Sequence, residues 1–225
     1  MKNITLKLHS LVCFTLIFTS VTAAFSHTKN TNVLEHTKSK ALTIVTITDT
    51  NFKNVLLNHT PTIDSNNDGE IQVTEAEAYS GAIFASSSSI SDLTGIEAFI
   101  NATELYCGGN SLTSLDLSSN KKLTIVFCNQ NQITTLTANA NTDLTFLNCS
   151  DNSNLSNLNI TSAINLITLL ADNCNLTTLN VSSNTNLQIL QCSGNQLTNI
   201  DISNNIALIT FICCLLYTSP SPRDA

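Results

Sequence analysis

Apolar and polar residues recur along most of the chain with a period of roughly 21 residues. Residues 123–143 illustrate the repeat, whose pattern is L-x-x-L-x-C-x-x-N-x-L-x-x-L-x-L-x-x-N-x-x, with other apolar residues in some leucine positions. Each period contains two short runs in which apolar and polar residues alternate, and successive side chains of a strand point to opposite faces of a sheet. The pattern therefore predicts two short strands per turn. Stacked turns, with strands ~4.8 Å apart, would bury the apolar positions.

One position of the repeat marks about seven successive turns. It is occupied by cysteine or alanine, at Ala85, Cys107, Cys128, Cys149, Ala171, Cys192 and Cys213. We expect an internal ladder of free thiols, because unpaired cysteine behaves as a small buried apolar residue. Disulfides between neighbouring rungs and a metal or redox site are the alternatives. Parallel side chains disfavour both, because a disulfide or a metal ion needs side chains that converge.

An asparagine follows the cysteine position by three residues, where the chain must turn. It is present as Asn110, Asn131, Asn152 and Asn195, and Cys174 replaces it in one turn. An asparagine amide can satisfy backbone groups in a buried bend. We therefore expect a column of buried amides that bond to the backbone and to one another along the stack.

This repeat resembles the leucine-rich-repeat family in its 21-residue bacterial class, over residues 82–213. The departures from that pattern are Ala138, Ala163, Ala171 and Cys174. The resemblance implies a β-rich solenoid, a right-handed coil of about seven turns of roughly 21 residues each, with parallel β-sheets. It also implies a binding module rather than an enzyme.

A second motif precedes the repeats at residues 64–75 and resembles the EF-hand calcium loop, D-x-N-x-D-G-x-I-x-x-x-E. Calcium takes six to eight oxygen ligands, which alternating positions of a tight loop can supply. The expected ligands are the side chains of Asp64, Asn66 and Asp68, the carbonyl of Glu70, Gln72 directly or through water, and both oxygens of Glu75. A turn that binds no ion is the alternative. A helix from the Asp49–Thr50 cap through Leu57 and another over residues 74–79 would complete a small helical EF-hand-like cap at 49–81.

The two ends of the chain carry other signals. Residues 1–24 have lysines, a short apolar run and small residues, typical of a secretory signal peptide. The run is too short for a transmembrane segment, and a membrane anchor is the weaker alternative. Residues 25–48 are a lead-in segment with a possible strand at 41–48. Residues 214–225 resemble a translated sequencing adapter, and a natural Pro/Ser tail is the alternative.

The net charge of the chain limits the classes of partner that it can bind. Residues 25–213 contain six lysines, no arginine and fifteen acidic residues, a net charge of −9. Nucleic acids and anionic membranes require clustered basic residues, so both are excluded as partners. No histidine lies within the repeats and no catalytic motif is present, so we expect no enzymatic activity.

The first strand of each turn should carry apolar side chains on its outward face as well. An exposed apolar surface marks an interaction site. We expect a ligand-binding surface made of Tyr106, Ile125, Phe127, Phe146, Leu170 and Ile189. The alternative is that these residues only stabilise neighbouring strands.

The sequence therefore predicts a secreted or cell-surface module that binds a protein or glycan, stabilised by Ca²⁺. The alternative is a non-catalytic targeting domain of a longer exported enzyme, truncated at the adapter-like junction.

Overall fold

A computed structural model describes residues 43–214. The predicted signal peptide, the lead-in segment up to residue 42 and residues 215–225 of the adapter-like segment lie outside the described residues. Among the described residues, no helix has the length and apolar character needed to cross a membrane.

Two helices form the cap that precedes the repeats. Helix α2 (Thr50–Leu57) begins after Asp49, whose Oδ1 accepts the backbone N–H groups of Asn51 and Phe52 and satisfies two free donors. Helix α3 (Val73–Ala78) begins one residue before its predicted start. Instead of the strand considered for residues 41–48, the lead-in makes one antiparallel bridge from Ile44 to Gln72. The predicted helices are therefore present, and they flank the EF-hand-like loop.

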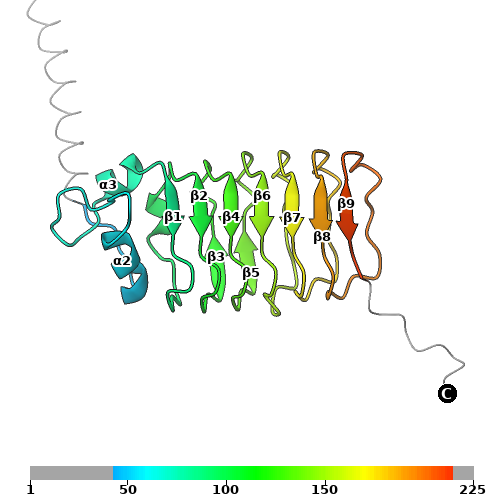
Figure 1. The fold of residues 1–225 in the computed structure, drawn as a ribbon, viewed down its shortest axis with the longest axis horizontal. Coiled ribbons are helices and arrows are strands. Elements are labelled where there is room, and N and C mark those ends of the chain that lie inside the picture. The colour runs from blue at the N-terminus through cyan, green and yellow to red at the C-terminus, as the bar shows by residue number, and fades with distance from the viewer. Residues whose placement is uncertain (1–42, 215–225) are drawn as a thin grey trace, which may run out of the picture. The chain divides into compact units, whose positions relative to one another are not determined.

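Seven short parallel strands follow one another in sequence order to form the main sheet (Figure 1). They are β1 (Ala82–Phe84), β2 (Glu104–Tyr106), β4 (Ile125–Phe127), β6 (Phe146–Asn148), β7 (Thr168–Leu170), β8 (Ile189–Gln191) and β9 (Thr210–Ile212). Each strand pairs in register with the equivalent residues of the next turn, one period further along the chain. The predicted parallel solenoid is confirmed, with six such steps between its seven strands.

The second strand of each turn is less regular than the sequence predicts. Within residues 43–214, only β3 (Ser114–Asp116) and β5 (Thr135–Thr137) pair as strands, and a single bridge from Thr137 to Asn159 continues the pairing. The later runs contain asparagine and aspartate, as in residues 178–180 and 199–201. Asparagine, which is absent from β3 and β5, is a poor strand former and accounts for the loss of regular pairing there; aspartate does not, since β3 contains Asp116. The first turn has a short 3-10 helix η1 (Ile96–Ala98) in this half.

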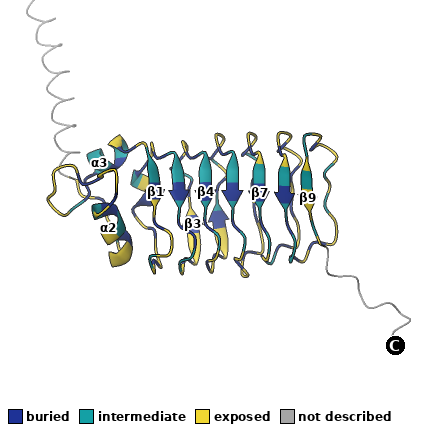
Figure 2. Cartoon of the chain, in the orientation of Figure 1, coloured by how far each residue is buried: buried dark blue, intermediate teal, exposed yellow. Residues whose placement is uncertain are grey.

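The core runs through the stacked turns as continuous columns (Figure 2). In the seven-stranded sheet, the central residue of every strand before β9 is fully buried, namely Ile83, Leu105, Val126, Leu147, Leu169 and Leu190. The predicted ladder of Cys107, Cys128 and Cys149 is fully buried too, and all described cysteines are free thiols. Burial raises the pKa of the Cys107 thiol to about 12, so this position is an apolar rung rather than a nucleophile.

The asparagine column ties each turn to the turn before it. The Asn131 amide donates to the carbonyls of Cys107 and Cys128, while its Oδ1 accepts the N–H of Leu112. Asn152 repeats this arrangement one turn later. The expected backbone bonds are therefore present. The expected bonds between column amides do not occur among the described residues, because both amide hydrogens already reach carbonyls.

Cys174 lies in a turn where the N–H group that an asparagine oxygen would accept is already hydrogen-bonded. The preceding turn has an extra residue between Asn152 and Leu155, and the Leu155 N–H bonds to the Asn152 carbonyl. The Leu155 N–H, which is the counterpart of the Leu112 N–H, is therefore not free for an amide oxygen at position 174. The Cys174 thiol lies 3.3 Å from the Cys149 carbonyl oxygen and donates to it. This donor is all that the column still needs at this position.

Candidate functional site

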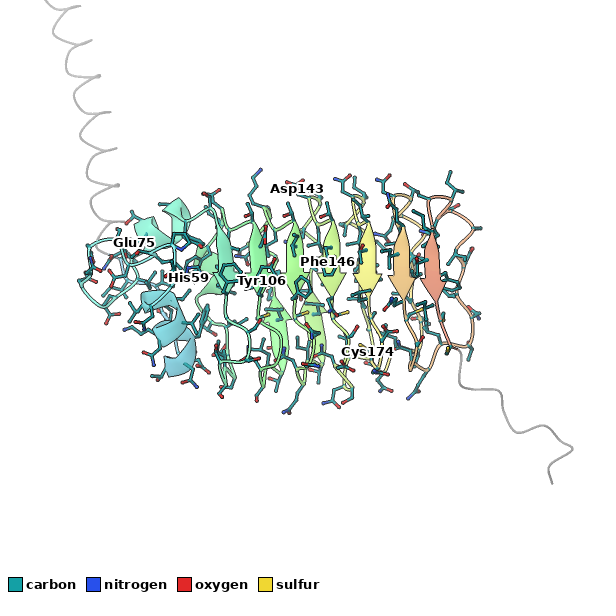
Figure 3. The ribbon with its side chains drawn as sticks, in the orientation of Figure 1. His59, Glu75, Tyr106, Asp143, Phe146 and Cys174 are labelled. Atoms are coloured by element: carbon teal, nitrogen blue, oxygen red, sulfur yellow. The ribbon has the colours of Figure 1, made fainter. Side chains whose placement is uncertain are left out.

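A row of stacked aromatic rings crosses the outward face of the seven-stranded sheet. We call Phe84, Tyr106, Phe127 and Phe146 the aromatic stripe. Ring centroids are 5.2 Å apart from Phe84 to Tyr106, 5.1 Å from Tyr106 to Phe127 and 4.6 Å from Phe127 to Phe146. Each pair is close to parallel, with interplanar angles of 14–27°. Figure 3 shows Tyr106 and Phe146 on this line across the strands.

Strand register produces the stacking. Phe84, Tyr106 and Phe127 occupy the third position of paired strands, so their Cα atoms are adjacent across the parallel ladder. Neighbouring strands lie ~4.8 Å apart, close to the separation at which aromatic rings stack. Phe146 belongs by register to the column of Ile125, yet its ring packs on Phe127. The stripe therefore passes diagonally from one column to the other at β6.

His59 from the cap extends the stack beyond β1. Its ring lies 5.8 Å from that of Phe84 at an interplanar angle of 6°. Its Nε2 lies 3.2 Å from the Phe84 backbone nitrogen, which donates, and its Nδ1 lies 3.0 Å from the Pro61 carbonyl oxygen. With Nε2 as the acceptor, Nδ1 is placed to donate to the Pro61 carbonyl.

The outward face of the sheet carries little charge. Its fourteen outward positions, the first and third of each strand, include one charged residue, Glu104, which accepts the Tyr106 hydroxyl at 2.7 Å. The six residues predicted for the ligand surface, Tyr106, Ile125, Phe127, Phe146, Leu170 and Ile189, all lie on this face and are half-buried. Phe84 is 55% exposed. The face is thus a largely apolar strip on an acidic molecule.

The predicted calcium loop is also part of the cap, and it is a separate candidate site from the aromatic stripe. Gly69 bends the loop with φ +82°, and its N–H donates to Asp64 Oδ2. Asn66 and Asp68 accept the N–H groups two residues ahead of them. Glu75, labelled in Figure 3, folds back so that Oε1 accepts the Ser65 N–H at 2.8 Å. The loop is therefore a compact turn held by its own hydrogen bonds.

One atom of this loop points to a cation. Asp64 is 5% exposed, and its Oδ1 is buried without a hydrogen-bond partner. A buried carboxylate oxygen is costly unless a donor or a cation compensates it. Gln72 and Asp68 are held nearby, with Gln72 Nε2 2.8 Å from Asp68 Oδ2. The Glu70 carboxylate pairs instead with Lys53 at 2.7 Å, which leaves only its carbonyl for the predicted role.

The acidic side chains do not converge on one point. Across residues 43–214, no three His, Cys, Asp or Glu side chains are grouped closely enough to hold a metal ion. Asp64, Asn66, Asp68, Gln72 and Glu75 are oxygen-bearing residues of the type that calcium takes, so the donor set fits in chemistry. The ligand roles assigned to them and to the Glu70 carbonyl stay a prediction.

Solved structures resemble the repeat region. Internalin inlF from Listeria monocytogenes is 18% identical over 74% of this chain and 56% of its own length, with a TM-score of 0.60. A secreted internalin-like protein from the same organism is 23% identical over 72% of this chain and 62% of its own, with a TM-score of 0.57. The chain has the internalin leucine-rich-repeat fold.

The likeness covers only part of each neighbour. The functional domain of InlJ from Listeria monocytogenes is 28% identical, but its TM-score is 0.38 and the match covers 41% of its length. The chain thus spans less than two thirds of each of these internalins. No family model matches the sequence, and no curated protein is similar to it.

Sequence reasoning missed two members of the outward aromatic stack. Phe84 lies one period before Tyr106 in the same frame, so the period alone was sufficient to find it. His59 left no such signal, because it lies outside the repeats and reaches the stack only when the cap docks on β1.

Proposed function

We propose that the chain is a protein-interaction module of the bacterial surface or secreted type, and that the aromatic stripe is the centre of its contact surface. The observation that carries this proposal is the near absence of charge on a face with four aromatic rings, in an acidic molecule. The cores of protein interfaces are depleted in charge and enriched in aromatic residues. The internalin-like fold, including that of a secreted protein, supports an extracellular or surface location.

Ring geometry favours a protein over a glycan at the stripe. Both faces of Phe84, Tyr106 and Phe127 are covered by neighbouring rings, so solvent reaches mainly the ring edges. Packing of a sugar against an aromatic residue requires a ring face. Apolar side chains of a protein can pack against ring edges and against the adjacent Ile125, Leu170 and Ile189.

Selection from a displayed library tests the proposal. Peptides would be selected from a random phage-displayed library on the immobilised full chain. They would then be measured on a Tyr106→Ser, Phe127→Ser, Phe146→Ser variant and on a Thr178→Ser, Asn199→Ser control. Loss of interface anchors of this kind costs about 2 kcal/mol or more, which is roughly 30-fold in Kd. Unchanged affinity on the folded triple variant, checked by circular dichroism, rules the stripe out as the contact surface.

We further propose that the loop 64–75 binds Ca²⁺ and stiffens the cap. The partnerless Asp64 Oδ1 supports this proposal. A bound ion would supply positive charge next to that oxygen. The cap residues hold the first strand of the repeats, so the effect of the ion would reach that strand through the cap. A single loop of this kind in an extracellular module has a Kd of about 10⁻⁴–10⁻³ M. Thermal melting with and without calcium tests it.

A further inference from the structure

A cleft separates helix α2 from the first strand and the loop after it. It is a broad depression, mostly open to solvent, with a volume of about 570 Å³. One wall is α2 with the residue that follows it, and the other is formed by β1 and the loop after it. The residues that carry the argument are Asn51, Asn54, Val55, Asn58, Phe84 and Ser88.

Three amides line the helical wall. Asn51, Asn54 and Asn58 are three and four residues apart, so they lie on one side of the helix. The Asn51 amide donates to the Ser89 carbonyl and the Asn58 amide to the Asn54 carbonyl. These bonds do not use the side-chain oxygens of Asn51 and Asn58. The Asn54 side chain is exposed. The wall therefore offers both hydrogen-bond donors and acceptors.

The cleft is electrically neutral in a molecule that is strongly acidic. Asp, Glu, Lys and Arg are absent from its lining. His59 also lines the cleft, and its Nε2 is occupied by the Phe84 N–H. A ligand with net charge would find no counter-charge here. A neutral polar ligand would keep its hydrogen bonds.

Peptide binding by strand addition is blocked at this edge. A peptide would have to pair with the free side of β1. There, His59 already accepts the Phe84 N–H, and the Tyr79 hydroxyl donates to the Ala82 carbonyl at 2.7 Å. The remaining recognition groups are amides, hydroxyls and the apolar edge of Phe84. Amides donate and accept at once, as sugar hydroxyls do.

We infer that this cleft binds a neutral saccharide of one or two units. The asparagine amides bond the hydroxyl groups, and Val55 contacts the apolar C–H surface. Binding rests on hydrogen bonds from α2, so it does not require Tyr106, Phe127 or Phe146 and does not depend on the proposed protein partner.

Saturation-transfer NMR with the full chain tests the inference. The probes are cellobiose, maltose, N,N′-diacetylchitobiose and lactose, with 6′-sialyllactose as the charged counterpart of lactose. We expect at least one neutral probe to bind and its affinity to exceed that of the charged one. Asn54→Ala should weaken it about 5- to 10-fold, the effect of losing one hydrogen bond. Asn54→Asp should weaken it too, because the shape is kept and the donor is lost.

The control is Asn157→Ala, an exposed asparagine on the opposite half of a later turn. It should leave saccharide binding unchanged. Absence of binding for all four neutral probes at 20 mM overturns the inference, as does equal affinity in wild type and Asn54→Ala. Binding of a blocked Ala-Ser-Ala peptide that Asn54→Ala weakens, without saccharide binding, also overturns it. The Tyr106, Phe127 and Phe146 variant should still bind saccharide, so failure of either proposal is seen separately.

Discussion

His59 accepts the backbone N–H of Phe84 and stacks on the ring of the same residue. One side chain of the cap thus meets both the main chain and the side chain of the first strand. Phe84 would otherwise present an unpaired donor at a sheet edge, where further strands can add. Tyr79 does the same for the Ala82 carbonyl. These two side chains complete hydrogen bonds that an additional strand would otherwise make.

Substitution of His59 should weaken the edge. His59→Phe keeps a ring to stack on Phe84 but leaves the Phe84 N–H without an acceptor, at a cost of about 1–3 kcal/mol in unfolding free energy. His59→Ala also loses the ring contact, about 0.5–1.5 kcal/mol more. Urea unfolding and hydrogen exchange of the Phe84 amide measure both effects. Asn54→Ala, in the same cap, should change neither. Slow exchange of the Phe84 amide in His59→Phe would contradict the role assigned to Nε2.

The asparagine column supports a reciprocal pair of substitutions. Asn131→Cys should lower the unfolding free energy by about 1–3 kcal/mol, because the Leu112 N–H loses its acceptor. Cys174→Asn should bring no gain, because the Leu155 N–H is already bonded to the Asn152 carbonyl. Denaturant unfolding of the two variants compares them directly. If the asparagine stabilises position 174 by more than about 1 kcal/mol, the explanation for the thiol is wrong.

Calcium should raise the melting temperature of the full chain. With a Kd of 10⁻⁴–10⁻³ M, 10 mM calcium adds about 1.4–2.7 kcal/mol. For a domain of this size that corresponds to roughly 3–10 °C. Scanning calorimetry in calcium and in EDTA measures the shift, and Asp64→Asn should abolish it. Ser156→Asn, far from the loop, serves as the control variant. An equal shift in the Asp64→Asn variant would place calcium elsewhere.

Acid should loosen the cap before the repeats. Asp49 Oδ2 accepts the N–H and hydroxyl of Ser91, and Asp92 Oδ2 accepts the Thr48 hydroxyl, so both carboxylates join the cap to the first turn. Burial opposes ionisation of Asp49, but its hydrogen bonds prevail and lower its pKa. The bond from Thr48 lowers the pKa of Asp92.

The sign of the pH effect follows from these lowered values. A carboxyl group with a lower pKa in the folded state stabilises the fold above its ordinary pKa of about 4. That stabilisation is lost as the pH falls through the folded value. Urea unfolding from pH 7 to pH 2 should therefore show a decline that is smaller in an Asp49→Asn, Asp92→Asn variant, and the variant should be less stable at pH 7. Parallel curves for the two proteins would exclude this coupling.

The repeat region was predictable because one period determines strand, register and core together. A residue placed by register, such as Tyr106, has its neighbours determined by counting one period along the chain. The contact of Phe146 with Phe127 was less accessible, because it depends on a ring orientation across two columns. Contacts of the cap were beyond this reasoning. Its docking on β1 depends on single long-range hydrogen bonds, such as that from Phe84 to His59, which no period signals.

The second strand of each turn shows what the sequence pattern could not predict. Alternation predicted them in every turn, yet only β3 and β5 pair over their length. Alternation reports which side chains face inward, and these positions are buried as expected, at Leu158 and Leu179 among others. It does not report whether the backbone is close enough to its neighbour for a continuous ladder. In the asparagine-rich runs the apolar side chains face inward as predicted, but the backbone does not form a continuous ladder with its neighbour.

The position of an extra residue within a turn has a consequence for reading other sequences of this repeat class. Two turns here are longer than the rest by a single residue. In the first, the addition lies between Leu93 and Ile96, far from the bend, and Asn110 still accepts the Ile90 N–H. In the other it lies beside the bend, and the following turn has a thiol in place of the amide. A cysteine found at the asparagine position should therefore signal an insertion one turn upstream, so a single substitution can reveal where a homologue's alignment needs a gap.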